Sequence, residues 1–163
     1  VMSNLGLIMA CKRYGFRHRA SKVGDRYVLE DMQRLGSVIG GEDSGHTIFL
    51  DYHTTGDGIL TAMQLIRAMV SSGKPLSELA RVMDVYPQQL LNVAVSSKPD
   101  LATVPQVVDA IAQVESELGE SGRVLVRYSG TQNLCRVMVE GPSAEAIEAY
   151  CRQIAAAIET AIG

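Results

Sequence analysis

Few aromatic residues and few cysteines distinguish this sequence of 163 residues, which has no Trp, two Phe and three Cys. Without Trp, its core has to be built from Leu, Ile, Val, Met and Ala. Three cysteines without a C-x-x-C spacing exclude a disulfide framework and a paired-cysteine zinc site, and they indicate a reducing, cytoplasmic compartment. No apolar run reaches the ~20 residues that a helix needs to cross a bilayer, so we expect no membrane segment.

The sequence also lacks an excess of positive charge. Its formal net charge is −3, which argues against a general nucleic-acid-binding protein. The chain starts at Val1 without an initiator Met, a basic leader or a signal-peptide pattern. We therefore expect that it begins inside a larger chain, and we expect neither nucleic acid nor a membrane as a partner.

Two segments with different patterns divide the chain, residues 1–80 and residues 81–163. In the first, helices alternate with short strands, and the third helix carries an apolar stripe that includes Met63 and Met69, which we expect to be core residues. The predicted helices are 4–15, 25–35 and 59–70, and the predicted strands are 37–39 and 47–50. This segment is predicted to be part of an α/β domain.

After a predicted linker at residues 74–86, the order becomes strand–helix–strand–strand–helix. The predicted strands are 90–96, 123–127 and 135–140. The first helix of this segment is predicted to begin at a capping box headed by Thr103 and to end at Gly119. The last helix is predicted from Ser143, with an apolar face made of Ile147, Tyr150, Cys151, Ile154 and Ile158. This order predicts a small α+β domain.

The strongest candidate site is the hairpin at residues 127–136. It contains two arginines, two hydroxyl groups and one glycine: Arg127, Arg136, Ser129, Thr131 and Gly130. A hairpin brings both guanidinium groups to one end of the strands, and the glycine lets backbone N–H groups approach a ligand. Such a set of groups binds a phosphate dianion. The alternative is an ordinary turn whose arginines are solvated or paired with Glu140.

A second candidate is the glycine-rich connection at residues 40–46. Its polar side chains are those of Glu42, Asp43, Ser44 and His46. A carboxylate that accepts hydrogen bonds and a hydroxyl that also donates them suit the vicinal hydroxyls of a sugar. The alternatives are a plain exposed loop and a metal site made of Glu42, Asp43 and His46. The metal is the weaker alternative, because adjacent carboxylates and one His lack separated ligands.

A weaker candidate lies at residues 23–27, where a helix is predicted to begin. The free N–H groups of the first turn and Arg26 could hold an anion there. Simple N-capping by Asp25 is the preferred alternative. The three histidines have no spacing that pairs them with a nucleophile, so no Ser-His-Asp or Cys-His arrangement is predicted.

Several of these motifs, in this order along the chain, resemble the bacterial phosphoglucosamine mutases of the α-D-phosphohexomutase superfamily. The matching segments are residues 1–6, 23–30, 40–46, 48–52, 54–58, 127–131 and 136–140. The resemblance implies the C-terminal portion of a four-domain enzyme. Residues 1–80 would be part of its third, three-layer α/β domain, and residues 81–163 would be its mobile C-terminal domain, which closes by a hinge near the linker.

Such an enzyme interconverts glucosamine 6-phosphate and glucosamine 1-phosphate by means of an active-site phosphoserine and Mg²⁺, for cell-wall precursor synthesis. The phosphoserine loop and the Asp-Gly-Asp metal loop have no match here. Because phosphoryl transfer needs both, we expect no catalytic residue, no metal ligand, no bound cofactor and no mutase activity in this chain alone. The implied partners are the phosphosugar substrate, the missing N-terminal half and, for the full-length protein, a second copy in a homodimer.

The resemblance also implies roles for individual residues. Those expected near the sugar are Glu42, Ser44, Gly45, His46 and, with less support, Gly24 and Asp25. Those expected to bind the non-reacting phosphate are Arg127, Ser129, Gly130 and Thr131, supported by Arg136. Some positions depart from the family pattern, and they put the fine specificity in question: Asp43, His53, Tyr128, Gln132 and Asn133.

Two further functional hypotheses stay open at this point. One is a non-catalytic phosphosugar-binding module, and the other is a purely structural interaction domain that binds no sugar phosphate. Within the superfamily, a phosphomannomutase or a phosphoglucomutase is the alternative to the glucosamine enzyme.

Overall fold

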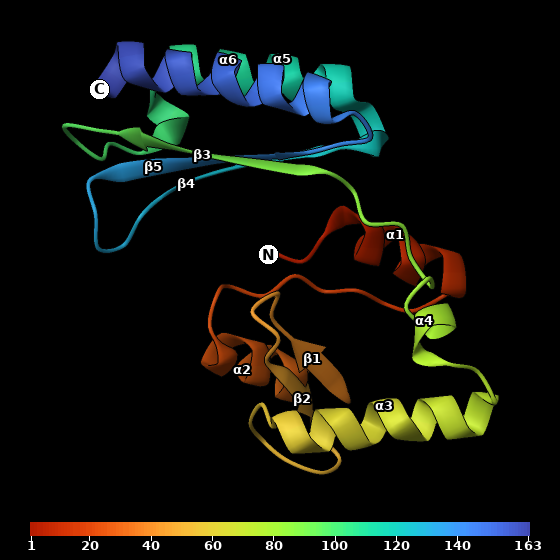
Figure 1. Cartoon of the computed structure of the whole chain (residues 1–163). Helices are drawn as coiled ribbons and strands as arrows, with labels where there is room; N and C mark the ends of the chain where they lie inside the picture. The colour runs from red at the N-terminus through yellow and green to blue at the C-terminus, as the bar shows by residue number, and fades with distance from the viewer. The chain divides into compact units, whose positions relative to one another are not determined.

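The chain folds as two units, and the computed structural model describes all of it, residues 1–163. The division lies between Val85 and Tyr86, a few residues after the boundary predicted at residues 80 and 81. Each unit has its own helices and its own sheet (Figure 1).

The first unit contains four helices and a two-stranded sheet. Its elements are α1 (Leu5–Tyr14), α2 (Asp25–Leu35), β1 (Ile39–Gly41), β2 (Thr47–Phe49), α3 (Gly58–Ser72) and α4 (Leu76–Leu79). Glycines in the left-handed conformation end the three long helices at Gly15, Gly36 and Gly73. The helix α4 lies inside the segment predicted as a linker, so that prediction is wrong for these four residues.

The sheet of the first unit is an antiparallel hairpin in which Gly40 pairs with Ile48. The predicted strand at residues 37–39 is displaced, since β1 includes both glycines that were assigned to the connection. Gly40 packs against α2, where an added Cβ would lie 2.4 Å from the Met32 sulfur. The close approach of the helix explains the glycine, and Val28, Met32 and Ile48 form the core of this unit.

Helix α3 forms as predicted, but its apolar stripe is not a core face. None of its residues is buried, and Ile59 and Val70 are 81% and 78% exposed. A helix of 15 residues is about 22 Å long, whereas the three-residue strand β2 beside it spans about 10 Å. The strand is therefore too short to cover the helix.

The second unit has the predicted order strand–helix–strand–strand–helix. Its elements are β3 (Gln88–Ala94), α5 (Pro105–Leu118), β4 (Arg123–Tyr128), β5 (Leu134–Glu140) and α6 (Ala144–Ile162), with 3-10 turns at Leu101–Thr103 and Gly119–Ser121. The antiparallel sheet has the order β3-β5-β4, and both helices lie on the same face of it (Figure 1).

The core of the second unit lies between that face of the sheet and the two helices. Alternate residues of the central strand β5, namely Cys135, Val137 and Val139, are fully buried. The apolar face of α6 meets them with buried Ile147, Cys151, Ile154 and Ile158, as predicted, and Tyr150 packs at the edge. The sheet thus has one face covered by the two helices, and its other face carries the polar residues together with the buried Met138.

The predicted start of α5 is wrong. Val104 is the N-cap, and no side chain caps the helix. Asp100 accepts a hydrogen bond from the Ala102 N–H at 3.1 Å, and the Thr103 hydroxyl donates to the Asp100 carbonyl at 2.7 Å. Asp100 therefore starts a 3-10 turn that engages the threonine hydroxyl before α5 begins.

All three cysteines are free thiols, and two of them are buried in the second unit. Burial raises the pKa of the Cys135 thiol, and it raises the pKa of Cys151 from 9.0 to about 11. Both thiols therefore stay protonated near neutral pH and behave as apolar core groups. No helix of the chain has both the length and the apolar character that crossing a membrane requires.

Candidate functional site

The hairpin of β4 and β5 brings together the two arginines of the phosphate-binding prediction. Arg127 and Arg136 are direct cross-strand partners, followed by Tyr128 opposite Cys135. Residues 129–133 form the loop that joins the strands, here named the phosphate loop. The predicted placement of both guanidinium groups at one end of the hairpin agrees with this register.

Hydrogen bonds within the phosphate loop fix its shape. The Ser129 N–H donates to the Leu134 carbonyl at 2.8 Å, which closes the loop, and the Gln132 N–H donates to the Ser129 hydroxyl at 3.3 Å. Ser129 is only 4% exposed, whereas Gly130 and Thr131 lie exposed at the tip. The tip can thus present a hydroxyl and backbone amides to an anion.

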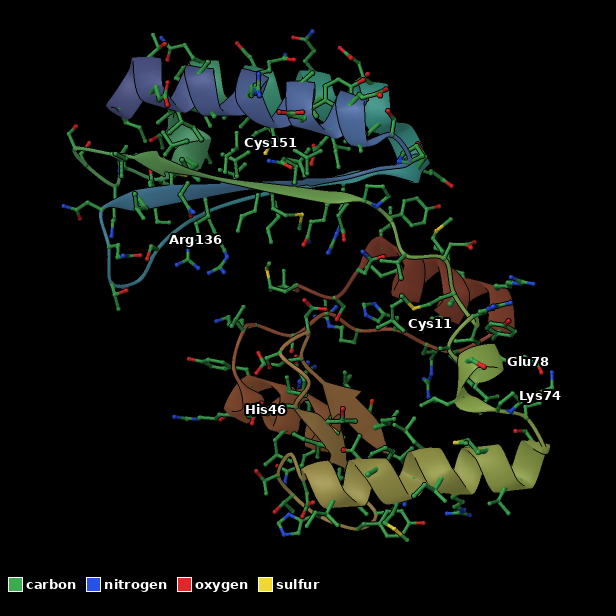
Figure 2. The ribbon with its side chains drawn as sticks, viewed as in Figure 1. Cys11, His46, Lys74, Glu78, Arg136 and Cys151 are labelled. Carbon is green, nitrogen blue, oxygen red and sulfur yellow. The ribbon has the colours of Figure 1, made fainter.

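Arg127 and Arg136 lie on the face of the sheet that the helices leave uncovered. Their neighbours Val126 and Val137 pack into the core, and alternation along the strands turns the arginines to the other face. Figure 2 shows Arg136 on this face and Cys151 on the opposite side of the sheet. The Arg136 Nε atom is buried and has no hydrogen-bond partner, so one donor beside the phosphate loop is unsatisfied.

The alternative in which Glu140 neutralises these arginines is wrong. Glu140 is fully buried and forms its ion pair with Arg123, its cross-strand partner, at the other end of the hairpin. The Gln88 amide also reaches this carboxylate, at 3.4 Å. The Glu140 carboxylate is therefore occupied by Arg123 and does not pair with Arg127 or Arg136.

In the first unit, the connection between β1 and β2 forms the second candidate, here named the sugar loop (residues 41–46). The Glu42 N–H donates to the His46 carbonyl at 2.9 Å, and the Gly45 N–H donates to the Glu42 carbonyl at 3.0 Å. Gly45 has a φ of 96°, a conformation that a residue with a side chain rarely adopts. These features make the connection a defined turn that leaves Ser44 exposed.

The start of α2 holds the sugar loop in place. The Gly24 N–H donates to Glu42 Oε1 at 2.7 Å, and His46 Nδ1 lies 3.1 Å from an oxygen of Asp25. The structure therefore brings together four of the six residues that the sequence assigns to the sugar. The N-cap of α2 is Gly24, so the interpretation of Asp25 as a capping residue is wrong.

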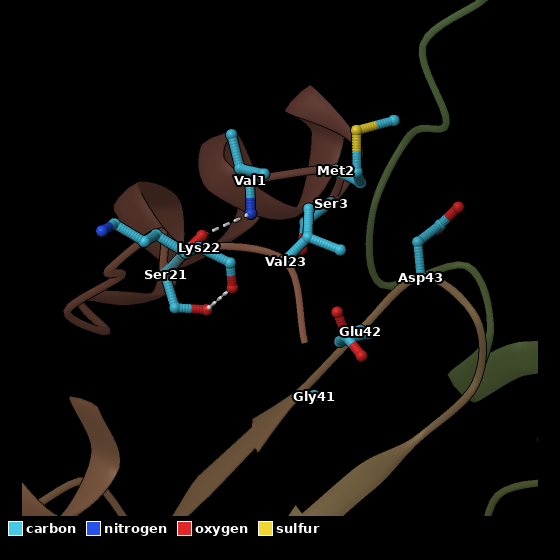
Figure 3. A pocket seen from close by; sticks show the side chains of 9 residues that line it. All are labelled: Val1, Met2, Ser3, Ser21, Lys22, Val23, Gly41, Glu42 and Asp43. Carbon is cyan, nitrogen blue, oxygen red and sulfur yellow. Dashed lines mark hydrogen bonds between the residues drawn. The ribbon is translucent and has the colours of Figure 1, made fainter. Parts of the chain in front are cut away.

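A small hollow lies beside Glu42 and is lined by three segments, residues 1–3, 21–23 and 41–43 (Figure 3). Across it, the ammonium group of Val1 donates to the Ser21 carbonyl at 3.1 Å. The hollow has a volume of about 20 Å³, which is room for about one water molecule, and the Lys22 ammonium points away from it toward the Tyr27 ring.

Comparisons with known protein families match both units. Residues 1–86 match the model described as phosphoglucomutase/phosphomannomutase, alpha/beta/alpha domain III, and residues 90–157 match that of the phosphoglucomutase/phosphomannomutase C-terminal domain. This chain belongs to the phosphoglucomutase/phosphomannomutase family. The resemblance stated from the motifs is thereby confirmed.

Two relatives within this family are named phosphoglucosamine mutase. The protein from Syntrophobacter fumaroxidans is 74% identical over 163 residues, which are 100% of this chain and 36% of that protein. The protein from Syntrophus aciditrophicus is 60% identical, again over 100% of this chain and 36% of its own length. The chain therefore spans about a third of the length of these relatives.

Solved structures of the superfamily share the fold at low sequence identity. An Aspergillus fumigatus N-acetylphosphoglucosamine mutase has a TM-score of 0.80 at 18% identity, and the match covers 99% of this chain and 37% of that one. A substrate complex of an N-acetylglucosamine-phosphate mutase has a TM-score of 0.74 at 18% identity, over 94% and 36% of the two chains. These similarities concern the fold.

Tyr128 is one of the positions that depart from the family pattern given by the resemblance. Its ring packs against the core, its hydroxyl is buried without a partner, and burial raises the pKa of that hydroxyl. At another departure from the family pattern, the Asn133 carbonyl accepts a hydrogen bond from the Val95 N–H at 3.0 Å. These two departures therefore contact the core and the residue that follows β3, while Gly130 and Thr131 lie exposed at the tip.

The magnesium implied by the family has no suitable site in this chain. The three side chains whose possible ligand atoms all lie within 4.8 Å of one another are Asp25, Glu42 and His46. Asp43, which the metal alternative included, is not among them. Mg²⁺ prefers an octahedral set of oxygen ligands, and a set with one imidazole and only two carboxylates does not fit it.

Sequence reasoning missed two residues on the side of the phosphate loop that faces β3. The Lys98 ammonium donates to the Ser129 carbonyl at 2.9 Å, and Asn92 is the cross-strand partner of Arg136. Asn92 lies in the predicted strand, and its register could have been derived from the alternation of buried residues. The contact of Lys98 follows from the path of the chain after β3, for which the sequence gives no signal.

Proposed function

We propose that this chain is the phosphosugar-recognition part of a phosphoglucosamine mutase, an isomerase that interconverts glucosamine 6-phosphate and glucosamine 1-phosphate through an enzyme phosphoserine. The observation that carries the proposal is the phosphate loop, with Arg127 and Arg136 paired across the sheet and with Gly130 and Thr131 exposed at its tip. The identity of 74% and 60% to relatives of that name favours the glucosamine enzyme over the other members of the family.

In this proposal, each unit recognises one part of the substrate. The two guanidinium groups and the tip of the phosphate loop bind the phosphate that does not react. In the first unit, Glu42 accepts hydrogen bonds from sugar hydroxyls and Ser44 contributes its own hydroxyl. His46 and Gly45 shape the sugar loop, with Gly24 and Asp25 behind it.

The chemical step belongs to residues outside this sequence. A phosphoserine and a magnesium site would come from the N-terminal half of the full-length protein, which we propose as the partner of this chain. Mg²⁺ would supply charge stabilisation to the transferring phosphoryl group there. The residues of this chain bind and orient the sugar phosphate, and positioning is a large part of catalysis in phosphoryl transfer. A cytoplasmic location, a role in cell-wall precursor synthesis and a homodimer of the full-length protein belong to the same proposal.

Titration calorimetry of the chain with glucosamine 1-phosphate tests the binding proposal. The Arg127→Ala variant removes a charge-assisted hydrogen-bond donor, and we expect its affinity to fall by more than about tenfold. Arg152→Ala is the matched control, because Arg152 is an exposed arginine of the same unit and pairs with Glu148 on α6. Equal affinities for the wild type and Arg127→Ala would contradict the assignment.

A mutase assay completes the test. The purified chain is expected to give no turnover of glucosamine 6-phosphate above a blank without enzyme, while it still binds glucosamine 1-phosphate. Turnover by the chain would refute the view that its part is recognition alone. Preferential binding of mannose 1-phosphate or glucose 1-phosphate would assign it to another branch of the family.

A further inference from the structure

Strand β3 extends the row of polar residues that Arg127 and Arg136 begin. In the sheet order β3-β5-β4, Asn92 pairs with Arg136, and Arg136 pairs with Arg127. The three residues therefore form one transverse row. Neighbouring positions in such a row lie about 4.5–5.5 Å apart, so one small anion can reach more than one of them.

Asn92 lies on the same face of the sheet as the two arginines. Its neighbours along β3, Leu91 and Val93, both pack into the core under the helices. The strand alternation then turns Asn92 to the uncovered face, where it is exposed. A carboxamide on that face offers two N–H donors to a phosphate oxygen beside Arg136.

The chain that follows β3 also contacts the phosphate loop. The Val95 N–H donates to the Asn133 carbonyl at 3.0 Å, which extends the pairing of β3 with β5 into the loop. The Lys98 ammonium donates to the Ser129 carbonyl at 2.9 Å. One of its three donors is used in this way, and the remaining two, with the full positive charge, are next to the loop.

We propose that Asn92 and Lys98 form a further part of the phosphate site, here named the third side, beside the two arginines and the phosphate loop. This proposal rests on the function proposed above and extends it. Lys98 is a positioning residue: it holds the Ser129 carbonyl, and so keeps the tip of the phosphate loop turned outward, while its charge adds to that of the arginines. Asn92 is a binding residue that donates to the phosphate next to Arg136.

Three positive charges around a phosphate dianion balance it better than two do in a shallow, exposed site, where water screens each pair. A lysine that donates to a carbonyl of the loop also couples the position of the loop to the end of β3. Removing Lys98 therefore acts on both the electrostatics and the shape of the site. Removing the Asn92 carboxamide acts on one hydrogen bond.

The test compares variants of the 163-residue chain with inorganic phosphate and glucosamine 1-phosphate as probes. Lys98→Met is expected to weaken both ligands by about tenfold, and Asn92→Leu by about threefold to tenfold. Lys98→Arg keeps the charge and the donor and is expected to restore most of the affinity. Arg152→Met removes one positive charge from the helix side of the same unit and should bind like the wild type.

Two readouts separate these roles from a general loss of structure. Lys98→Met should reduce the salt dependence of binding, because fewer charges are then screened. It should also speed up amide hydrogen exchange at Ser129 and Gln132, whose N–H groups close the loop, without lowering the melting temperature of the unit. Lys98→Arg should show neither change.

The outcomes are distinct for the two proposals. The proposed function stands if the wild type binds the probes and Arg127→Ala does not. In that case, wild-type affinity of both Lys98→Met and Asn92→Leu would overturn the third side. Weaker binding by Lys98→Met with unchanged loop exchange would overturn the positioning role. If the wild type binds neither probe, the proposed function fails, and the third side fails with it.

Discussion

The two units of this chain hold their candidate loops in different ways. In the second unit, fourteen buried residues form one core beneath the sheet that carries the phosphate loop. In the first unit, three buried residues, Val28, Met32 and Ile48, form the core beside the sugar loop. The phosphate loop thus depends on apolar packing at a distance from it, whereas the sugar loop depends on polar contacts within a few residues.

This difference shows that the length of the flanking strands decides how each loop is held in its own unit. Backbone pairing along six- and seven-residue strands fixes the ends of the phosphate loop, and the hydrogen bonds of Ser129 add to that pairing. The sugar loop follows strands of three residues each, and the hydrogen bond between Gly24 and Glu42 supplies part of what the sheet does not. Changes in the core should therefore affect the two loops unequally.

The largest expected effect comes from the core of the second unit. Ile154 on α6 is fully buried, and Ile154→Ala is expected to lower the free energy of unfolding of that unit by about 2–5 kcal/mol, because it leaves a cavity. Amide hydrogen exchange measured residue by residue checks the prediction. Protection should fall across Tyr86–Gly163 and remain unchanged in Val1–Val85. An equal loss of protection in both units would show that they unfold together.

A smaller effect is expected at the packing of the first unit. In Gly40→Ala, the new Cβ would lie 2.4 Å from the Met32 sulfur and 2.9 Å from a Val28 methyl group, and overpacking should cost about 1–3 kcal/mol. Gly58→Ala is the matched control, since a Cβ there would meet no atom within 4 Å. Chemical unfolding of the first unit should separate the two variants. A Gly40→Ala protein as stable as Gly58→Ala would mean that α2 can move away from β1 at no cost.

A pH effect distinguishes the cores further. The pKa of Cys151 is raised from 9.0 to about 11 by burial, so between these values the unfolded chain loses the thiol proton and the folded chain keeps it. The unfolded state then binds fewer protons, and stability falls as the pH rises from about 9 to about 11, by about 2–3 kcal/mol. Cys151→Ala should be less stable at pH 8 but should lose this part of the alkaline decline. An identical decline in both proteins, measured by urea unfolding from pH 8 to 11, would exclude Cys151 as its source.

The same contrast explains which features could be predicted from the sequence. A long periodic pattern such as that of α6 indicates which of its residues are buried, here Ile147, Cys151 and Ile154 among others. The order of the elements and the core residues of the second unit could therefore be predicted. The apolar stripe of α3 predicted a helix correctly, but burial depends on what lies beside a helix, which its own sequence does not state. The capping box at Thr103 failed because Asp100, three residues earlier, uses the threonine hydroxyl in its turn.

The residues of the candidate sites also differ in how far they could be predicted from the sequence. Residues that act through neighbours in sequence, such as Ser129 and Thr131, carry a visible motif. Contacts between distant segments, such as Lys98 with the Ser129 carbonyl, depend on where the chain turns after a strand, and no local pattern encodes that. The contact of Asp25 with His46 is of this second kind, because 21 residues separate the two side chains.

The smallest expected effect on stability concerns that contact. Asp25 and His46 are 37% and 63% exposed at their side chains, so Asp25→Asn should leave the melting temperature of the first unit unchanged. Glu42→Gln should affect the loop more, because the Glu42 carboxylate accepts the partly buried Gly24 N–H at 2.7 Å, and a neutral amide is a weaker acceptor. Exchange of the Gly24 and Gly45 amides should therefore be faster in Glu42→Gln than in Asp25→Asn. If Asp25→Asn opened the sugar loop as much as Glu42→Gln, the imidazole contact would hold this loop as firmly as the backbone hydrogen bond to Glu42 does.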